Sequence, residues 1–216
     1  MSPELPVRPH ELLTALSAQR LMAIVRGSDS EAALNTVLTL VRSGVRLVEV
    51  SLSGADALNV IAQARAVLGP DALLGAGTVL TAEDARRAAE AGAAYVVTPA
   101  VTEAVAASRV LGLPVLAGAL TPTEVVAALR EGATAVKLFP AGPGGVELLR
   151  ALRAPFPDVP FVPVGGVGAV TARECLAEGA VAVGVGGPLV GRAADGDPTG
   201  LAGRIAAFRT LAEEAS

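Results

Sequence analysis

Short apolar runs alternate regularly with longer stretches in which apolar and polar residues follow a helical period. The apolar runs are rich in Val, Leu and Ala, and branched residues of this kind are typical of strands buried on both faces. They predict eight strands, at Leu21–Arg26, Leu47–Leu52, Leu73–Gly77, Tyr95–Thr98, Val115–Gly118, Ala135–Phe139, Phe161–Gly165 and Ala180–Gly186. The stretches between them predict helices that include Ser30–Arg42, Ala55–Val67, Ala82–Ala91 and Pro122–Glu131.

The order of these elements predicts the fold class. Strands that alternate with helices form parallel β-α units, and eight units with a period of roughly 24 residues favour an α/β fold of the closed (β/α)8 TIM-barrel type. An open doubly wound sheet is the structural alternative. No Pro-rich or Ser-rich linker interrupts the alternation, so we expect a single barrel domain over residues 1–216. A short helix from about Arg8 to Ala18 is expected to cap one end.

Glu49 interrupts the apolar run Leu47–Leu52. Side chains alternate between the two faces of a strand, so Val48 and Val50 are expected to face the helices while Glu49 and Ser51 face the barrel interior. A carboxylate in so apolar a place is costly unless it is paired or takes part in chemistry. Glu49 is therefore a candidate catalytic residue.

Lys137 interrupts the run Ala135–Phe139 in the same way, between Val136 and Leu138. The alternation points it into the barrel, where it could face Glu49 across the interior. A buried ammonium without a partner is costly, and the usual relief is loss of its proton, which leaves a nucleophilic amine. Such an amine can form a Schiff base with a carbonyl substrate. The alternative is a lysine at the end of the strand whose ammonium reaches solvent.

Further polar and glycine-rich groups follow other predicted strands, at the end of the barrel where active sites of this fold lie. Arg26 ends the first strand and could bind a carboxylate or a phosphate, although a plain surface arginine fits the position equally well. Thr78 follows the third strand and offers a hydroxyl at the barrel mouth. Gly165-Gly166 and Gly186-Gly187 end the last two strands, where backbone N–H groups often bind phosphate. Two flexible turns are the alternative there.

Composition narrows the classes of partner. The formal net charge is -4 and the 17 Lys and Arg residues form no dense block, so we expect neither a nucleic-acid nor a membrane partner. The apolar runs end well before the length of a membrane span. His10 is the single histidine, which argues against a metal site built on several histidines and against Ser-His-Asp catalysis. We expect no metal and no other cofactor.

Cys175 is the single cysteine, which excludes a disulfide within the chain. We expect it to be a small buried residue of a helix in a reducing compartment. The start of the chain, Met1–Pro6, lacks the apolar segment of a secretion signal. These two features predict a cytoplasmic protein.

A set of motifs in fixed order spans nearly the whole chain and lies at the ends of the predicted strands. The chain thereby resembles the class I aldolases that cleave 2-keto-3-deoxy-6-phosphogluconate (KDPG), a family that also includes 4-hydroxy-2-oxoglutarate (KHG) aldolase and the 6-phosphogalactonate enzyme. The resemblance rests on Ile24-Val25-Arg26-Gly27, Val48-Glu49-Val50, Gly75-Ala76-Gly77-Thr78-Val79, Val97-Thr98-Pro99, Thr121-Pro122-Thr123-Glu124, Val136-Lys137-Leu138-Phe139-Pro140 and Val164-Gly165-Gly166-Val167.

The resemblance implies a small-molecule 2-keto acid as substrate, Lys137 as the Schiff-base lysine and Glu49 as the acid/base. It also implies that the members of a substrate site come from several strand ends, namely Arg26, Thr78, Pro99 and Phe139, with the glycines Gly165, Gly166, Gly186 and Gly187 taking a phosphate. A homotrimer is implied by the same likeness.

Three positions depart from the family pattern. Ser53 stands where many phosphogluconate-type members carry an arginine that binds the substrate carboxylate, and we assign this short polar residue to the substrate site. Val164 replaces the usual threonine before the seventh-strand glycines, as in the galactonate type. Pro188 stands where a serine often follows the last glycine pair, and proline cannot donate a hydrogen bond. These departures leave the choice of substrate open.

The resulting functional hypothesis is an Entner–Doudoroff aldolase that cleaves KDPG, or a close 2-keto-3-deoxy acid, to pyruvate and glyceraldehyde 3-phosphate. The first alternative is a KHG aldolase that gives pyruvate and glyoxylate. A metal-assisted barrel such as a sugar-phosphate epimerase is a rival enzyme class, and a catalytically silent sugar-phosphate-binding barrel is a rival outside enzymes. Retention of both Glu49 and Lys137 argues against the silent barrel.

Overall fold

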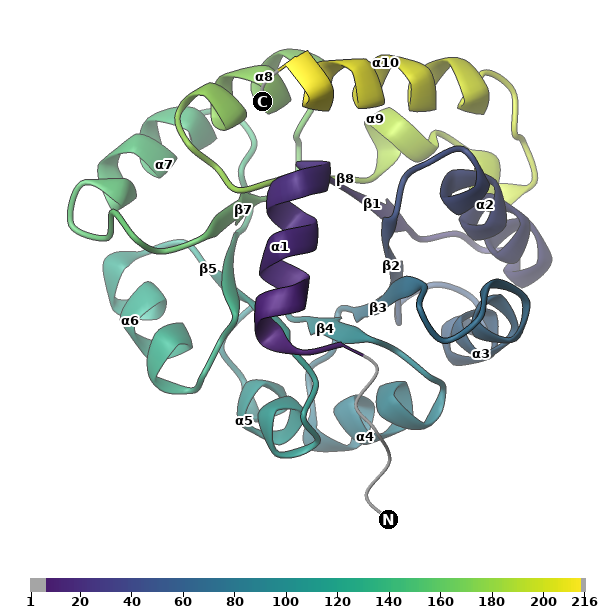
Figure 1. Cartoon of the computed structure of the whole chain (residues 1–216), viewed down its shortest axis with the longest axis horizontal. Helices are drawn as coiled ribbons and strands as arrows, with labels where there is room; N and C mark the ends of the chain where they lie inside the picture. The colour runs from purple at the N-terminus through teal and green to yellow at the C-terminus, as the bar shows by residue number, and fades with distance from the viewer. Residues whose placement is uncertain (1–6, 215–216) are drawn as a thin grey trace.

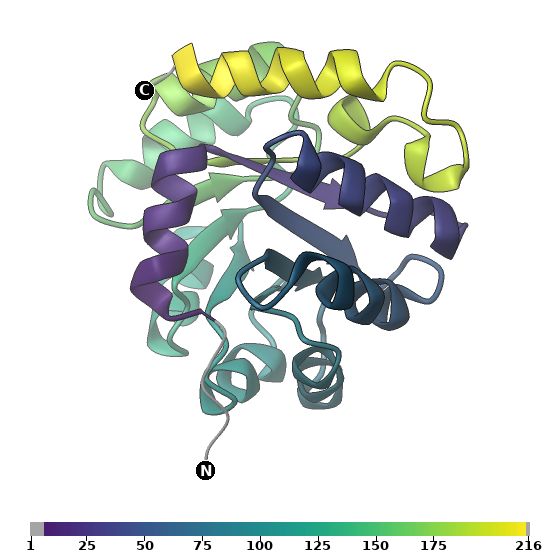
Figure 2. The same cartoon turned by 45° about the vertical axis from the view of Figure 1, so that its right-hand side comes forward.

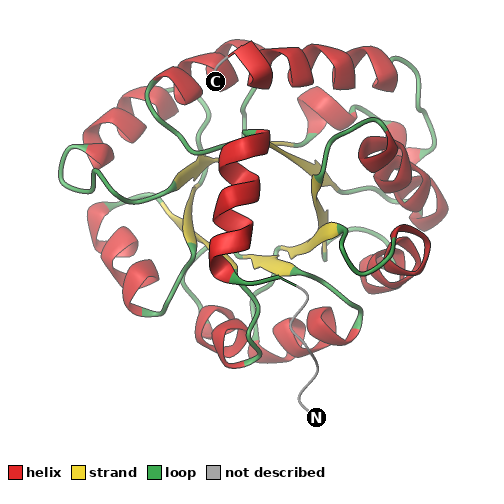
Figure 3. Cartoon of the chain, viewed as in Figure 1, coloured by secondary structure: helices red, strands yellow, loops and turns green. Residues whose placement is uncertain are grey.

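The computed structural model describes residues 7–214, and within them eight parallel strands form one sheet that curls into a barrel (Figures 1 and 3). Neighbouring strands follow the chain from β1 to β7, and β8 pairs with β1. The ring closes through a bridge between Val164 and Gly184. The predicted TIM barrel is confirmed, and the alternative of an open doubly wound sheet is wrong. The strands are β1 (Leu21–Val25), β2 (Leu47–Ser51), β3 (Leu73–Gly77), β4 (Tyr95–Val97), β5 (Val115–Ala119), β6 (Ala135–Leu138), β7 (Phe161–Pro163) and β8 (Val183–Val185).

Helices form an outer layer around these strands, and α10 packs along α8 and α9 (Figure 2). Several helices begin at a threonine whose side chain accepts a backbone N–H, as at Thr81 and Thr121. This cap satisfies N–H groups that the first turn of a helix leaves free. The helices are α1 (Pro9–Gln19), α2 (Ser30–Arg42), α3 (Ala57–Leu68), α4 (Ala82–Glu90), α5 (Glu103–Val110), α6 (Pro122–Arg130), α7 (Gly145–Arg153), α8 (Ala169–Ala177), α9 (Gly187–Val190), the 3₁₀ turn η1 (Ala193–Asp195) and α10 (Leu201–Glu214).

α1 crosses one end of the barrel, as the sequence predicts (Figure 1). Its residues Leu12 and Leu16 are fully buried and belong to the inner core with Met22, Leu47 and Leu116. These inward side chains lie at the starts of their strands, so α1 closes the N-terminal end of the barrel. Chemistry is thereby confined to the opposite end, where the strands finish.

Some boundaries differ from the prediction. The third helix begins at Ala57 rather than Ala55, because Asp56 takes a left-handed conformation with φ 45° that ends the preceding turn. The eighth strand begins at Val183 rather than Ala180, since the residues before it run from the end of α8 into the barrel. Arg26 and Phe139 lie just past β1 and β6 instead of inside them. Both are therefore in loops at the open end.

Other expectations concern single residues and the ends of the chain. Cys175 is buried, as predicted, and His10 is exposed on α1. Between residues 7 and 214 no helix combines the length and the apolar character that crossing a membrane requires. The start Met1–Pro6, where no secretion signal is expected, lies outside the described residues.

Candidate active site

Glu49 lies on β2 and points into the barrel, with 1% of its surface exposed. Its neighbours Val48 and Val50 belong to the separate core between the strands and the helices. The alternation read from the sequence is thus confirmed. Burial raises the pKa of the Glu49 carboxyl, and the charge of Lys137 offsets part of this effect. The carboxyl is therefore held closer to the protonated state than an exposed glutamate.

Lys137 lies on β6 with 5% of its surface exposed, and Val136 and Leu138 pack on the helix side. Its Nζ lies 4.8 Å from the centre of the Phe139 ring, a cation–π distance. The side chain is inside the barrel, so the alternative of a lysine extended into solvent is wrong. β2 and β6 are four strands apart in the ring of eight, which places Glu49 and Lys137 on opposite walls. Among residues 7–214 they are the two charged residues that are buried.

Lys137 is also the only lysine of the chain, because the other basic residues are all arginines. This signal is available from the sequence alone, and it supports a chemical role for the Lys137 amine. An arginine supplies charge but does not lose its proton in proteins, so it cannot act as an amine nucleophile. The one position that carries lysine is the buried one.

Two inward positions of β3, Gly75 and Gly77, are glycines that leave room for neighbouring side chains. A β-carbon at Gly77 would lie 1.7 Å from Oε1 of Glu49, and one at Gly75 would lie 2.2 Å from the ring of Tyr95. A side chain at Gly75 would overlap the Tyr95 ring, and one at Gly77 would displace the Glu49 carboxylate. Tyr95 is fully buried on β4 beside this surface. Sequence reasoning missed it, although the only tyrosine of the chain in an inward strand position is a usable signal.

Three hydroxyl groups meet where β2 and β3 end. Ser51 Oγ lies 2.8 Å from Ser53 Oγ and 2.8 Å from Thr78 Oγ1. Thr78 has a φ of 59°, a left-handed conformation that is uncommon for a β-branched residue. The structure thus brings the predicted residues Ser53 and Thr78 together through Ser51, and it holds Thr78 in a strained conformation typical of functional loops.

Pro99 and Phe139 follow β4 and β6. The turn of Pro99 passes directly over β5, because a β-carbon at Gly118 would lie 2.2 Å from the Pro99 carbonyl. Phe139 is 36% exposed and packs on the turn after β7, where a β-carbon at Gly165 would lie 2.8 Å from its ring. Both residues therefore lie at the open end of the barrel, near the β6 wall that carries Lys137.

The two glycine pairs differ in their surroundings. Gly165 and Gly166 both have left-handed backbones, with φ of 86° and 75°, and Gly166 packs against the turn at Gly142. Gly187 begins α9, and a β-carbon there would contact nothing within 4 Å. Gly186 caps the same short helix, and its carbonyl accepts the N–H groups of Leu189 and Val190. The first pair is fixed by packing, and the second borders open space.

Arg26 is exposed just past β1, and within the described part of the chain it forms no ion pair or side-chain hydrogen bond. The turn that carries Arg26 packs against the segment of Ala194 and Asp195. A β-carbon at Gly27 would lie 1.9 Å from the Ala194 carbonyl oxygen. The N–H and hydroxyl of Ser28 both donate to Asp195, at 2.8 and 2.9 Å. The guanidinium is thus unpaired on a well-held turn.

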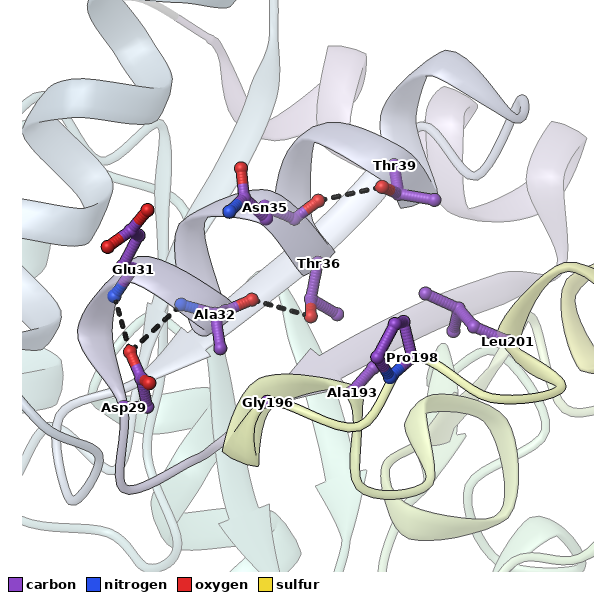
Figure 4. A pocket seen from close by; sticks show the side chains of 10 residues that line it. All are labelled: Asp29, Glu31, Ala32, Asn35, Thr36, Thr39, Ala193, Gly196, Pro198 and Leu201. Carbon is purple, nitrogen blue, oxygen red and sulfur yellow. Dashed lines mark hydrogen bonds between the residues drawn. The ribbon is translucent and has the colours of Figure 1, made fainter.

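A surface hollow of about 290 Å³ lies away from these residues, between α2 and the segment from Ala193 to Leu201 (Figure 4). Three of its polar side chains are used within α2: Asp29 accepts N–H groups of the first turn, and Thr36 and Thr39 donate to carbonyls of their own helix. The buried charged residues lie elsewhere, in the barrel interior, and we place the site there. From residue 7 to residue 214, no three His, Cys, Asp or Glu side chains are grouped to hold a metal.

Comparison with known proteins identifies the family. Residues 13–197 match the family described as KDPG and KHG aldolase. The 2-dehydro-3-deoxy-phosphogluconate aldolase of Treponema pallidum is 38% identical over 158 residues, which cover 72% of this chain and 75% of that protein. A probable 2-dehydro-3-deoxy-6-phosphogalactonate aldolase of Rhizobium meliloti is 36% identical over 173 residues, covering 78% of this chain and 81% of that one.

Solved structures agree with this assignment. The crystal structure of KDPG aldolase from Legionella pneumophila, with pyruvate captured as a covalent carbinolamine, has a TM-score of 0.80 to this chain. The two are 26% identical, and the match covers 97% of this chain and 98% of that one. The chain therefore belongs to the KDPG and KHG aldolase family of lyases.

Proposed function

We propose that the protein is a class I aldolase that cleaves KDPG, or a close 2-keto-3-deoxy acid, to pyruvate and glyceraldehyde 3-phosphate through a Schiff base on Lys137. One observation carries the proposal: the only lysine of the chain and the carboxyl of Glu49 are buried on opposite walls of the same barrel interior. The pyruvate carbinolamine of the Legionella pneumophila relative supports covalent chemistry in this family.

The reaction begins with Lys137 in its amine form. Its Nζ adds to the C2 ketone to give a carbinolamine, and loss of water gives a protonated imine. The C3–C4 bond then breaks, and its electron pair moves into the imine to form an enamine. The C4 hydroxyl loses its proton to Glu49, directly or through one water, and the aldehyde leaves. Glu49 returns the proton to C3 of the enamine, and hydrolysis releases pyruvate and the free amine.

The environment of Glu49 suits this double use. Burial raises the pKa of its carboxyl, which brings the proton affinity closer to the working pH of a general acid/base. The hydroxyls of Thr78 and Ser53 and the guanidinium of Arg26 are the groups we assign to the polar parts of the substrate. Pro99 and Phe139 form the apolar walls of this site. The phosphate is assigned to the turns at Gly165-Gly166 and Gly186-Gly187.

KHG is the second candidate substrate, and one observation favours it. At the start of α9, Pro188 has no N–H, while the N–H groups of Leu189 and Val190 donate to the Gly186 carbonyl at 2.9 and 2.8 Å. Few N–H groups are therefore free to bind a phosphate at this turn. Cleavage of KHG gives glyoxylate, which carries no phosphate.

On the family likeness we also propose that the chain folds as one domain, acts in the cytoplasm on the Entner–Doudoroff pathway and assembles as a homotrimer. Light scattering coupled to gel filtration tests the assembly directly. A mass of three chains agrees with the proposal, and a mass of one or two chains contradicts it.

A cleavage assay tests the activity and the choice of substrate. Wild type is compared on KDPG and KHG, with pyruvate release coupled to lactate dehydrogenase. We expect a higher kcat/KM for KDPG and no loss of activity on treatment with EDTA. Lys137→Arg keeps the charge and much of the volume but cannot form an imine, so it should be inactive on both. A strong preference for KHG would overturn the first choice of substrate, and EDTA-sensitive cleavage would contradict the metal-free mechanism.

A further inference from the structure

Tyr95 is a buried polar residue that the mechanism above does not use. It lies on β4 with none of its surface exposed. Among residues 7–214 its hydroxyl has no hydrogen-bond partner, and the same holds for Oε2 of Glu49. A buried hydroxyl without a partner is costly, and phenylalanine would fill the same volume without that cost. The presence of the hydroxyl therefore calls for a reason.

The register of three strands places Tyr95 beside Glu49. Glu49 of β2 pairs with Gly75 of β3, and Gly75 pairs with Tyr95 of β4. The three residues form one row across the sheet, and the middle one has no side chain. The ring of Tyr95 occupies the space over Gly75, where a β-carbon would lie 2.2 Å from it. The carboxylate of Glu49 occupies the space over Gly77 in the same way. Both side chains thus converge on the inner face of β3.

Electrostatics agree with this proximity. Burial, and after it the charge of Glu49, raise the pKa of Tyr95 well above its usual value. The phenol therefore keeps its proton at any working pH and can serve as a hydrogen-bond donor. The nearest group that can accept from it in this row is the carboxylate whose Oε2 lacks a partner among the described residues.

We propose that Tyr95 is a positioning residue for Glu49: its hydroxyl donates to the carboxylate through one water and orients it towards the substrate. This inference rests on the proposed function, in which Glu49 is the acid/base. A donor to the carboxylate favours the ionised form, so the tyrosine works against the effect of burial. It keeps Glu49 available as a base after each proton transfer.

The groups around Glu49 make the expected pH effect specific. Lys137 faces it from β6 and Tyr95 from β4. β3 presents Leu73, Gly75 and Gly77, none of which carries a charge, and Arg26 lies exposed beyond the end of β1. Removing the hydroxyl therefore removes one donor and leaves every charge in place. We expect the pKa of Glu49 to rise by about one unit, as for loss of one hydrogen bond to a charged group.

Tyr95→Phe tests the inference, with Leu116→Val as the matched control. Leu116 belongs to the same inner core, and its shortening removes no polar atom. The first measurement is the pH dependence of kcat/KM. In Tyr95→Phe the limb on the acid side should move up by about one pH unit, with kcat lowered, whereas Leu116→Val should keep the wild-type midpoint. A Tyr95→Phe profile that superimposes on wild type overturns the inference.

The second measurement does not depend on turnover. The side-chain carboxyl carbon of Glu49 is followed by ¹³C NMR in protein labelled at glutamate, with Glu49→Gln identifying the resonance. Its midpoint should rise in Tyr95→Phe and not in Leu116→Val, and equal midpoints in wild type and Tyr95→Phe overturn the inference. Trapping of pyruvate on Lys137 by borohydride is run alongside. If wild type traps no pyruvate on Lys137, the proposed function is contradicted. The NMR titration still decides whether Tyr95 acts on Glu49.

Discussion

Gly77 and Glu49 are in such close contact that no side chain fits between them: a β-carbon at Gly77 would fall 1.7 Å from Oε1 of the carboxylate. Gly77→Ala must therefore displace the carboxylate from its place over β3. We expect kcat to fall by roughly 100-fold, as for a misplaced catalytic group. The added methyl group should cost about 1–3 kcal/mol of unfolding free energy. Steady-state kinetics and urea unfolding measure the two effects.

Gly203→Ala is the control for this substitution. Gly203 lies in α10, and a β-carbon there contacts nothing within 4 Å. Alanine is favoured over glycine inside a helix, so this variant should gain up to about 1 kcal/mol and keep wild-type kinetics. Equal kinetics for both alanine variants would show that the close contact at Gly77 does not matter for the reaction.

Glu49→Gln is expected to change how stability depends on pH. Because burial raises the pKa of Glu49 above its ordinary value of 4.5, the folded state binds this proton more tightly than the unfolded state does. The stability that this proton gives is fully present below pH 4.5 and is lost as pH rises through the folded pKa. Glutamine does not titrate there. The stability of Glu49→Gln relative to wild type should therefore increase as pH rises above 4.5, measured by urea unfolding across that range. A difference that does not change with pH would contradict the raised pKa.

Thr121→Ala tests the helix cap that follows β5. Thr121 Oγ1 accepts the Glu124 N–H at 3.3 Å, and Glu124 accepts the Thr121 N–H at 2.8 Å. Loss of this cap should cost about 1 kcal/mol. Thr123→Ala, two residues on and exposed, removes the same atoms without removing a cap and should cost much less. Urea midpoints compare the two, and equal losses would show that the cap contributes nothing.

The barrel and its two buried charges follow from local sequence pattern. Strand alternation is a property of neighbouring residues, so it correctly directs Glu49 and Lys137 inward and Val48 and Val136 outward. Helix starts are equally local, because a threonine followed by an acidic residue three positions on forms a cap. Both features are decided within a few residues and need no knowledge of the fold.

The rest of the site depends on register between strands that are distant in sequence. The row of Glu49, Gly75 and Tyr95 exists only because β2, β3 and β4 pair with this particular offset. The sequence shows that Tyr95 is the only tyrosine and that it lies in a strand, but it does not show which side chains lie beside it. The left-handed Thr78 is equally hidden, since a threonine normally avoids positive φ and is held there by its surroundings.

Covalent trapping tests the central claim most directly. The protein is incubated with pyruvate and borohydride, digested and analysed by mass spectrometry. Lys137 is the only lysine, so the α-amino group is the only other amine able to form an adduct. We predict a reduced pyruvate adduct on the peptide that contains Lys137 in wild type, and none on that peptide in Lys137→Met. No adduct on the Lys137 peptide of wild type, or an adduct on that peptide that persists in Lys137→Met, would contradict the Schiff-base account.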